Sequence, residues 1–157
     1  MLISLIVPCY NEQDSLPILY NALNAVRIEF PNYEFEYIFV DDGSKDKTLS
    51  VLKNLAVSDK YVRYYSFSRN FGKEAAMYCG LCEAKGDYVA IMDADMQDPP
   101  SLLPAMIRSL DNNECDICAA RRVTRQGEPK IRSFFARMFY KLINRMCDVE
   151  IADGARD

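Results

Sequence analysis

Short apolar segments alternate with amphipathic helical patterns along most of this chain, and this order constrains the fold more than any other feature. The first segment, residues 2–7, is almost entirely apolar, as expected for a strand buried on both faces of a parallel sheet. After it, apolar residues recur at helical spacing up to Phe30. Further strands are expected over 35–40, 61–67, 88–92 and 116–120, and further helices over 47–58, 73–85 and 99–110. Repeated strand–helix–strand units predict an α/β fold with a mostly parallel sheet covered by helices on both faces.

Polar clusters follow four of the expected strands, at residues 8–14, 41–46, 68–73 and 93–98. In sheets of this kind, ligands bind beyond the carboxyl ends of the strands. The sequence therefore predicts one binding site assembled from four separate parts of the chain.

The most distinctive cluster contains Asp93 and Asp95, two residues apart directly after an expected strand. Both carboxylates can reach one cation, and hard divalent ions such as Mg²⁺ or Mn²⁺ prefer oxygen ligands. Aspartates at this spacing also cap or turn a chain without binding anything. The motif alone leaves both interpretations open.

Two common glycine-rich phosphate-binding motifs, G-x-x-x-x-G-K-[ST] and G-x-G-x-x-G, are absent from the sequence. Their absence disfavours P-loop NTPases and dinucleotide dehydrogenases, and the lack of a glycine-rich basic loop after the first strand disfavours a nucleotidyltransferase. An acidic edge repels a bare diphosphate, so a bound nucleotide is expected to bring a divalent cation. The chain also has no histidine, which excludes histidine-based catalytic triads and general bases.

The six cysteines include two C-x-x-C pairs, at 79–82 and 115–118. The distance between the pairs exceeds the usual spacing in zinc ribbons. We therefore interpret the cysteines as small apolar residues of a protein from a reducing compartment.

Charge is unevenly divided: acidic residues dominate 1–118 and basic residues dominate 119–147, within a net charge of −4. Over 131–146, apolar residues recur at helical spacing between arginines and lysines. This pattern predicts an amphipathic helix that either lies on an anionic membrane surface or packs against a protein core. No apolar run reaches the length of a membrane span, and residues 1–8 are typical of a strand rather than of a signal peptide.

Three ordered motifs resemble glycosyltransferase family 2. They are I-V-P-C-Y-N-E at 6–12, V-D-D-G-S-K-D-K-T at 40–48 and D-A-D-M-Q-D-P at 93–99. The stretch R-N-F-G-K-E-A-A at 69–76 and the basic region 121–145 are similar to the polyprenyl-phosphate sugar transferases of that family, the dolichol-phosphate mannose and bactoprenol glucose type.

The resemblance covers essentially the whole chain and implies a GT-A fold, a UDP- or GDP-sugar donor and inversion at the anomeric carbon. It implies that Asp93, Asp95 and Gln97 hold Mg²⁺ or Mn²⁺. The donor-binding residues that it implies are Pro8, Tyr10, Asn11, Glu12, Asp41, Asp42, Lys73 and Asp93.

The acceptor implied by the resemblance is a polyprenyl phosphate, whose anionic phosphate needs cations for positioning. Arg121 and Arg122 are the candidates for this role, although arginines at a strand end are often only solvated. Asp157 is a candidate catalytic base or acceptor-orienting residue. Two alternatives stay open: a family 2 transferase that acts on a glycan hydroxyl in cell-envelope synthesis, and a nucleotide-sugar-binding module without catalysis.

We expect a single domain of 157 residues. Residues 1–120 are expected to bind the nucleotide sugar, and 121–157 to face the acceptor and the membrane, with 131–146 at the bilayer surface. Family members usually continue into membrane-spanning helices. The chain is therefore expected to be the catalytic part of an integral membrane protein at the cytoplasmic face, with no nucleic-acid partner.

Overall fold

The computed structural model describes residues 1–120, in which four strands form one sheet. The strands are β1 (Leu2–Cys9), β2 (Glu34–Asp41), β3 (Val62–Ser66) and β4 (Tyr88–Ile91). Their order is β3-β2-β1-β4, and every neighbouring pair is parallel. Residues 1–104 form one compact unit, and α4 extends from it into a second unit that begins at residue 105.

The two central strands, β1 and β2, supply most of the core. Every residue of β1 after Leu2 and every residue of β2 after Glu34 is buried. Apolar residues on both faces are what a parallel strand between two helical layers requires. The near-continuous apolar runs in the sequence predicted these two strands correctly.

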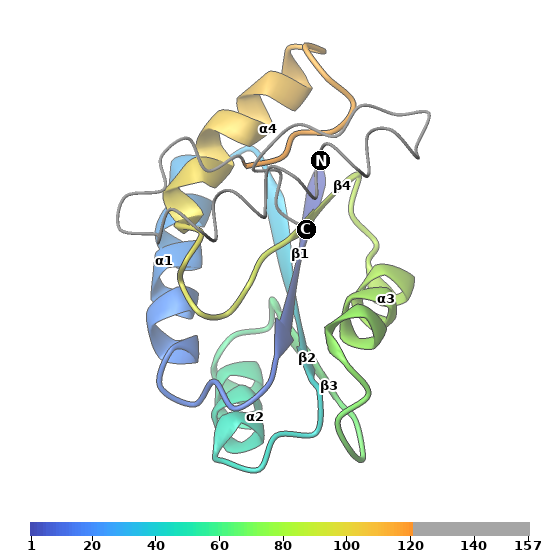
Figure 1. The fold of residues 1–157 in the computed structure, drawn as a ribbon. Coiled ribbons are helices and arrows are strands. Elements are labelled where there is room, and N and C mark those ends of the chain that lie inside the picture. Colours follow the sequence, from blue (N-terminus) through green and yellow to red (C-terminus); the bar gives the residue numbers. More distant parts are fainter. Residues whose placement is uncertain (121–157) are drawn as a thin grey trace, which may run out of the picture. The chain divides into compact units, whose positions relative to one another are not determined.

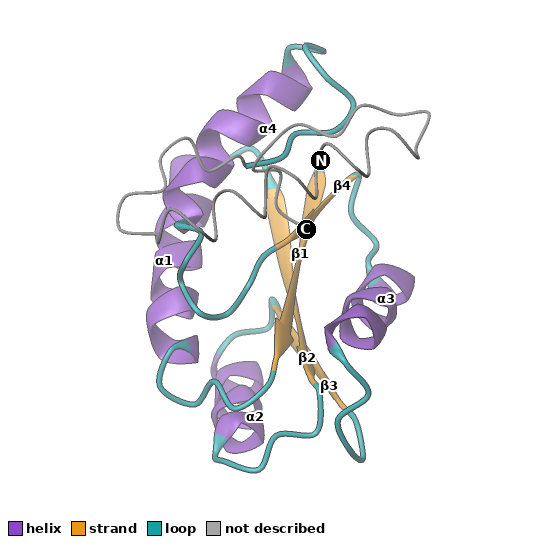
Figure 2. Cartoon of the chain, in the orientation of Figure 1, coloured by secondary structure: helices purple, strands orange, loops and turns teal. Residues whose placement is uncertain are grey.

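Helices cover both faces of the sheet (Figures 1 and 2). Helices α1 (Leu16–Glu29) and α2 (Thr48–Ser58) lie on one face, and α3 (Lys73–Glu83) lies on the other. Helix α1 buries Leu16, Leu19, Leu23 and Val26, which share one helical face by their spacing. The predicted α/β architecture is confirmed.

Gly80 allows α3 to lie close to β1. A Cβ atom at this position would be 2.3 Å from Cγ2 of Ile6, far inside van der Waals contact. Ala76, one turn earlier, is also fully buried and packs with Ile6, Ile38 and Val40. Two small residues at i and i+4 thus set the distance between this helix and the sheet.

A polar network around Glu36 ties the C-terminal end of α3 to the sheet. The Glu36 carboxylate accepts hydrogen bonds from Ser4 Oγ (2.6 Å), from the Lys85 amide (2.8 Å) and from Arg63 Nη1 (2.9 Å). Arg63 also donates to the backbone carbonyl and the carboxylate of Glu83, both at 3.1 Å. Burial alone would raise the pKa of Glu36, but these donors outweigh it and hold that pKa below its ordinary value.

The chain after β4 continues through a short 3₁₀ helix, η1 (Pro100–Leu102), into α4 (Leu103–Asp111), where a helix was predicted. The strand predicted over 116–120 is wrong, because this stretch has no regular secondary structure. Ile117, its most apolar side chain, is 85% exposed. Within the described residues this stretch has no neighbouring strand for its backbone groups, so it does not form a strand.

Strand β4 therefore ends the sheet within residues 1–120, and its outer edge has no strand partner there. Val89 and Ile91 on this strand are 44% and 39% exposed. In the part of the chain that the structure describes, no helix is long and apolar enough to cross a bilayer.

Candidate donor-binding site

The strand order creates a switch point beside β1. The chain runs outward from β1 to β2 and β3, and the connection after β3 then returns to the other side of β1, where β4 lies. Open α/β sheets bind ligands in the crevice at such a point, beyond the carboxyl ends of the strands.

A pocket of about 410 Å³ lies at these carboxyl ends. Its lining comes from the last residues of β1 and from the segments after all four strands: Pro8, Cys9, Tyr10, Glu12, Asp42, Asn70, Gly72, Lys73, Ala76, Asp93, Ala94 and Asp95. The four polar clusters of the sequence therefore meet at one pocket, as the expected strand arrangement predicts.

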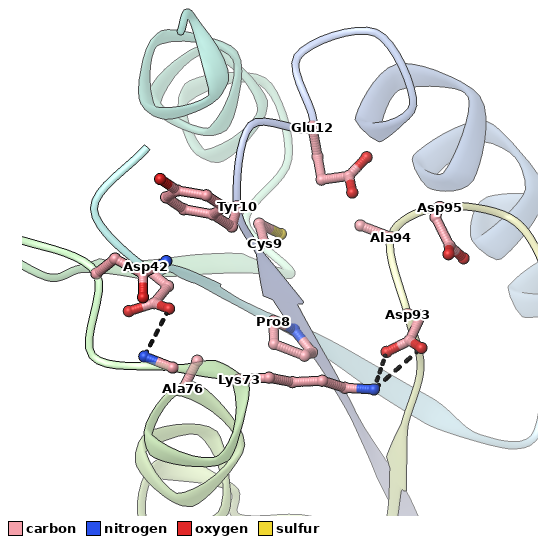
Figure 3. A pocket seen from close by; sticks show the side chains of 12 residues that line it. Pro8, Cys9, Tyr10, Glu12, Asp42, Lys73, Ala76, Asp93, Ala94 and Asp95 are labelled. Carbon is pink, nitrogen blue, oxygen red and sulfur yellow. Dashed lines mark hydrogen bonds and ion pairs between the residues drawn. The ribbon is translucent and has the colours of Figure 1, made fainter. Parts of the chain in front are cut away.

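The pocket is strongly acidic. Among the described residues, four carboxylates line it, from Glu12, Asp42, Asp93 and Asp95, and Lys73 is the one cationic side chain. In Figure 3, Tyr10 and Asp42 lie at the left of the pocket and Asp93 and Asp95 at the right. A ligand that spans the pocket therefore contacts two chemically different walls.

Lys73 connects these two walls. It is the first residue of α3, and its side chain extends past Pro8 to Asp93 (Figure 3). Its Nζ lies 2.8 Å from Oδ1 and 3.1 Å from Oδ2 of Asp93. The two side chains are 42% and 36% exposed, so water screens this ion pair.

Asp42 holds the loop that precedes α3. Its Oδ1 accepts a hydrogen bond of 2.6 Å from the Phe71 amide, and its Oδ2 accepts one of 2.9 Å from the Gly72 amide. The carboxylate therefore lines the pocket and also fixes the backbone from which Lys73 extends.

Asp41, by contrast, is not among the lining residues. It is 1% exposed, and its two carboxylate oxygens accept hydrogen bonds from the Ser44 amide (3.0 Å) and from Ser66 Oγ (2.9 Å). Both aspartates were predicted to bind the donor. The structure places only Asp42 at the pocket and gives Asp41 a role in ordering the turn after β2.

Asn11 joins the loops after β1 and β2 and also lies outside the lining. Its amide donates to Ser44 Oγ (2.9 Å), and its Oδ1 accepts from the Lys45 amide (2.8 Å). Gln97 likewise is not among the residues that line the pocket, and its amide donates to Asp95 Oδ1 (3.0 Å). The other predicted donor and metal residues within 1–120 all line the pocket.

Gly43 brings the loop after β2 against the loop before α3. Its φ of +67° lies in the left-handed region, and a Cβ atom there would be 2.3 Å from the carbonyl carbon of Arg69. Glycine is the residue that meets both conditions. The backbone around Asn70, which lines the pocket, therefore depends on this contact.

Five residues that line the pocket were not predicted as site residues from the sequence: Cys9, Asn70, Gly72, Ala76 and Ala94. All five belong to motif stretches quoted for the family. Cys9 is buried, which together with the nearby charges of Asp41 and Glu12 raises the pKa of its thiol well above the ordinary value. It forms part of the pocket floor as an uncharged, apolar side chain.

The donor atoms at Asp93 and Asp95 suit a hard divalent cation. No group of three or more acidic, histidine or cysteine side chains in residues 1–120 is arranged to hold a metal ion by itself. Mg²⁺ usually binds through one or two carboxylates together with substrate phosphates. The two aspartates therefore fit a cation that arrives with a phosphorylated ligand.

Four predictions fall outside the described residues. These are the acceptor-phosphate residues Arg121 and Arg122, the amphipathic helix over 131–146 and the candidate base Asp157.

The sequence of the chain matches the family described as "Glycosyl transferase family 2" over residues 4–156. The chain belongs to this family. The match includes all three motifs on which the resemblance was based, so the predicted family is confirmed.

Two curated relatives are each 40% identical to this chain. One is a "Putative glycosyltransferase CsbB" of Bacillus subtilis, with 99% of this chain and 46% of the relative aligned. The other is a "Prophage bactoprenol glucosyl transferase homolog" of Escherichia coli, with 100% of this chain and 51% of the relative aligned. The chain spans about half the length of these relatives.

Solved glycosyltransferase structures share the fold. Residues 1–349 of S. aureus TarS in complex with UDP-GlcNAc match with a TM-score of 0.63 and 26% identity, over 83% of this chain and 37% of that 1–349 chain. A Pyrobaculum calidifontis mannosyltransferase in complex with GDP-Man and Mn²⁺ matches with a TM-score of 0.54 and 27% identity, over 69% of this chain and 32% of that enzyme. The fold is GT-A, as predicted.

Proposed function

We propose that this chain is the catalytic part of an inverting, divalent-metal-dependent glycosyltransferase that moves a hexose from a UDP- or GDP-sugar to a polyprenyl phosphate. The observation that carries the proposal is the position of Asp93 and Asp95, which line one pocket with Tyr10, Asp42 and Lys73 at the switch point of the sheet. A module for an uncharged ligand has no need of four carboxylates in one pocket.

The two walls of the pocket suit two different parts of the donor. We assign the nucleoside to the wall with Tyr10 and Asp42, with Pro8 and Glu12 beside it, since an aromatic ring and a carboxylate can contact a base and ribose hydroxyls. The diphosphate then lies toward Asp93 and Asp95. Asp41 and Asn11 support this wall indirectly, through the turn that they order.

Breaking the glycosidic bond places negative charge on the diphosphate leaving group. Asp93 and Asp95, with Gln97 as a further oxygen ligand, would hold a divalent cation, which would supply Lewis-acid stabilisation of that charge. Lys73 offers a second positive charge to the same group. Its rigid attachment at the start of α3 limits how far the ammonium can move from the pocket.

An acceptor phosphate is already anionic near neutral pH, so its oxygen attacks without a strong base. In our proposal Arg121 and Arg122 bind that phosphate, and Asp157 orients the acceptor or removes its remaining proton. The amphipathic segment 131–146 brings the site to the cytoplasmic surface of the membrane, and the whole protein is anchored there by further helices. The name of the E. coli relative, a bactoprenol glucosyl transferase homolog, supports this choice of acceptor.

The test measures release of free nucleoside diphosphate from UDP-glucose and GDP-mannose in the presence of a polyprenyl phosphate. We expect release to require Mn²⁺ or Mg²⁺, to stop on addition of EDTA and to fall about 100-fold or more in Asp93→Asn and Asp95→Asn. Asp14→Asn is the matched control, because Asp14 is an exposed aspartate outside the pocket lining. Full turnover in EDTA would contradict the metal-dependent mechanism.

A second experiment compares a polyprenyl phosphate with an oligosaccharide as acceptor. With the better donor, we expect transfer to a polyprenyl phosphate and none to an oligosaccharide. Transfer to the oligosaccharide alone would show that the acceptor is a glycan hydroxyl and not a lipid phosphate. Tight nucleotide binding without transfer to either acceptor would indicate a binding module.

A further inference from the structure

We propose that the Lys73 ammonium pairs with Asp93 and neutralises it until the divalent cation and the donor bind. The ammonium then moves to the donor diphosphate. This inference rests on the proposed function, because it assumes that the site binds a metal–nucleotide complex. It assigns Lys73 two partners, one after the other: the carboxylate of Asp93 before metal and donor bind, and the phosphate oxygens of the donor afterwards.

The first line of support is the charge balance among the pocket's own side chains. Of the four lining carboxylates, Asp42 is compensated by two backbone amides, at 2.6 Å and 2.9 Å. Asp93 is compensated by Lys73, which contacts both of its oxygens. The ammonium thus lies on a carboxylate that a metal ion also needs, so the two cations compete for it.

The second line of support is the low cost of the exchange. Both partners of the Lys73–Asp93 pair are more than one third exposed, and exposed ion pairs of this kind contribute little to stability. A lysine ammonium is also a point charge on a flexible stem with three rotatable donors, so it can turn to a new oxygen without a change in the backbone. The pair is therefore suited to be broken in every catalytic cycle.

The third line of support is the anchoring of the lysine itself. Lys73 begins α3, and the preceding residue, Gly72, is held by its hydrogen bond to Asp42. The base of the side chain is fixed while its tip is free to change partners. An ammonium released from Asp93 consequently stays at the pocket, where the incoming diphosphate supplies anionic oxygens.

The experiment measures metal binding and nucleotide binding separately, and neither measurement depends on turnover. Mn²⁺ affinity is measured by electron paramagnetic resonance titration, without nucleotide, for wild type, Lys73→Met, Lys73→Arg and the control Lys53→Met. Lys53 is an exposed lysine of α2 outside the pocket lining, so its replacement removes the same charge elsewhere. The affinity for UDP and GDP is then measured by calorimetry at saturating Mn²⁺.

We expect Lys73→Met to bind Mn²⁺ about twofold to fivefold more tightly than wild type, because the competing ion pair is gone. The same variant is expected to bind the preferred nucleoside diphosphate about tenfold more weakly, because a charge-assisted contact is lost. Lys73→Arg, which keeps the competing cation, and Lys53→Met should retain the Mn²⁺ affinity of wild type. Mn²⁺ binding that is detected in Lys73→Met but is too weak to detect in wild type also supports the exchange.

Mn²⁺ affinity that is unchanged or weaker in Lys73→Met overturns the exchange, while a metal-dependent transferase would still stand. Absence of Mn²⁺ binding to every variant, even with UDP or GDP present, removes the metal from the proposed function and the exchange with it. The two failures are therefore distinguishable.

Discussion

The carboxylate of Asp42 accepts a hydrogen bond of 2.9 Å from the amide of Gly72, and this contact links the end of β2 to the start of α3. Its neighbour Asp41 accepts hydrogen bonds from Ser44 in the turn after β2 and from Ser66 at the end of β3, and it does not line the pocket. Two adjacent aspartates of one motif thus have separable roles.

We expect Asp42→Asn to weaken UDP or GDP binding about tenfold, because the amide side chain has one acceptor oxygen in place of two and one loop contact is lost. Asp41→Asn is expected to lower the free energy of unfolding by about 2 kcal/mol, since a buried charged acceptor is lost, with a smaller effect on nucleotide affinity. Calorimetric titration and denaturant unfolding of both variants measure the two effects. Equal loss of affinity in the two variants would contradict the assignment.

The contact between Gly43 and the Arg69 backbone gives a second prediction. We expect Gly43→Ala to destabilise the protein by about 3 kcal/mol, since it combines a strained φ with a steric clash. Gly43→Asn separates these causes, because asparagine tolerates a positive φ but still carries a Cβ atom. Denaturant unfolding should place Gly43→Asn near Gly43→Ala if the clash dominates. A Gly43→Asn variant as stable as wild type would show that the close approach is easily relieved.

The network around Glu36 predicts a pH dependence. Hydrogen bonds and Arg63 hold the pKa of Glu36 below its ordinary value of 4.5, so the charged form stabilises the folded state. This contribution is fully present above pH 4.5 and is lost as the pH falls through the lower folded-state value.

Glu36→Gln is therefore expected to be less stable than wild type by about 2 kcal/mol near neutral pH, and the difference should shrink below pH 4.5. Unfolding by urea at a series of pH values measures both quantities. A difference that stays constant down to pH 3 would mean that packing, not charge, accounts for the effect.

Much of this architecture follows from local patterns. The apolar runs of β1 and β2 and the helical spacing of Leu16, Leu19 and Leu23 each carry enough information to identify an element. Because parallel strands end on the same edge, the convergence of the four polar clusters follows from element order alone. The residues of the pocket were predictable to that extent.

Contacts between distant loops were not predictable in the same way. Asp41 and Asp42 have the same local sequence context, and only the position of Phe71 and Gly72 in space distinguishes them. The stretch 116–120 has a strand-like composition, but a strand also needs a partner, and composition does not specify one. The ion pair of Lys73 with Asp93 depends on the same long-range placement.

The outer edge of β4, which has no strand partner among the described residues, has a practical consequence. No strand of residues 1–120 pairs with that edge, and Val89 and Ile91 on β4 are partly exposed, so another polypeptide can add a strand there. Preparations limited to these residues are accordingly prone to self-association along this margin. A lysine in place of Val89 is a direct way to keep them monodisperse, since charge on a border strand opposes such addition.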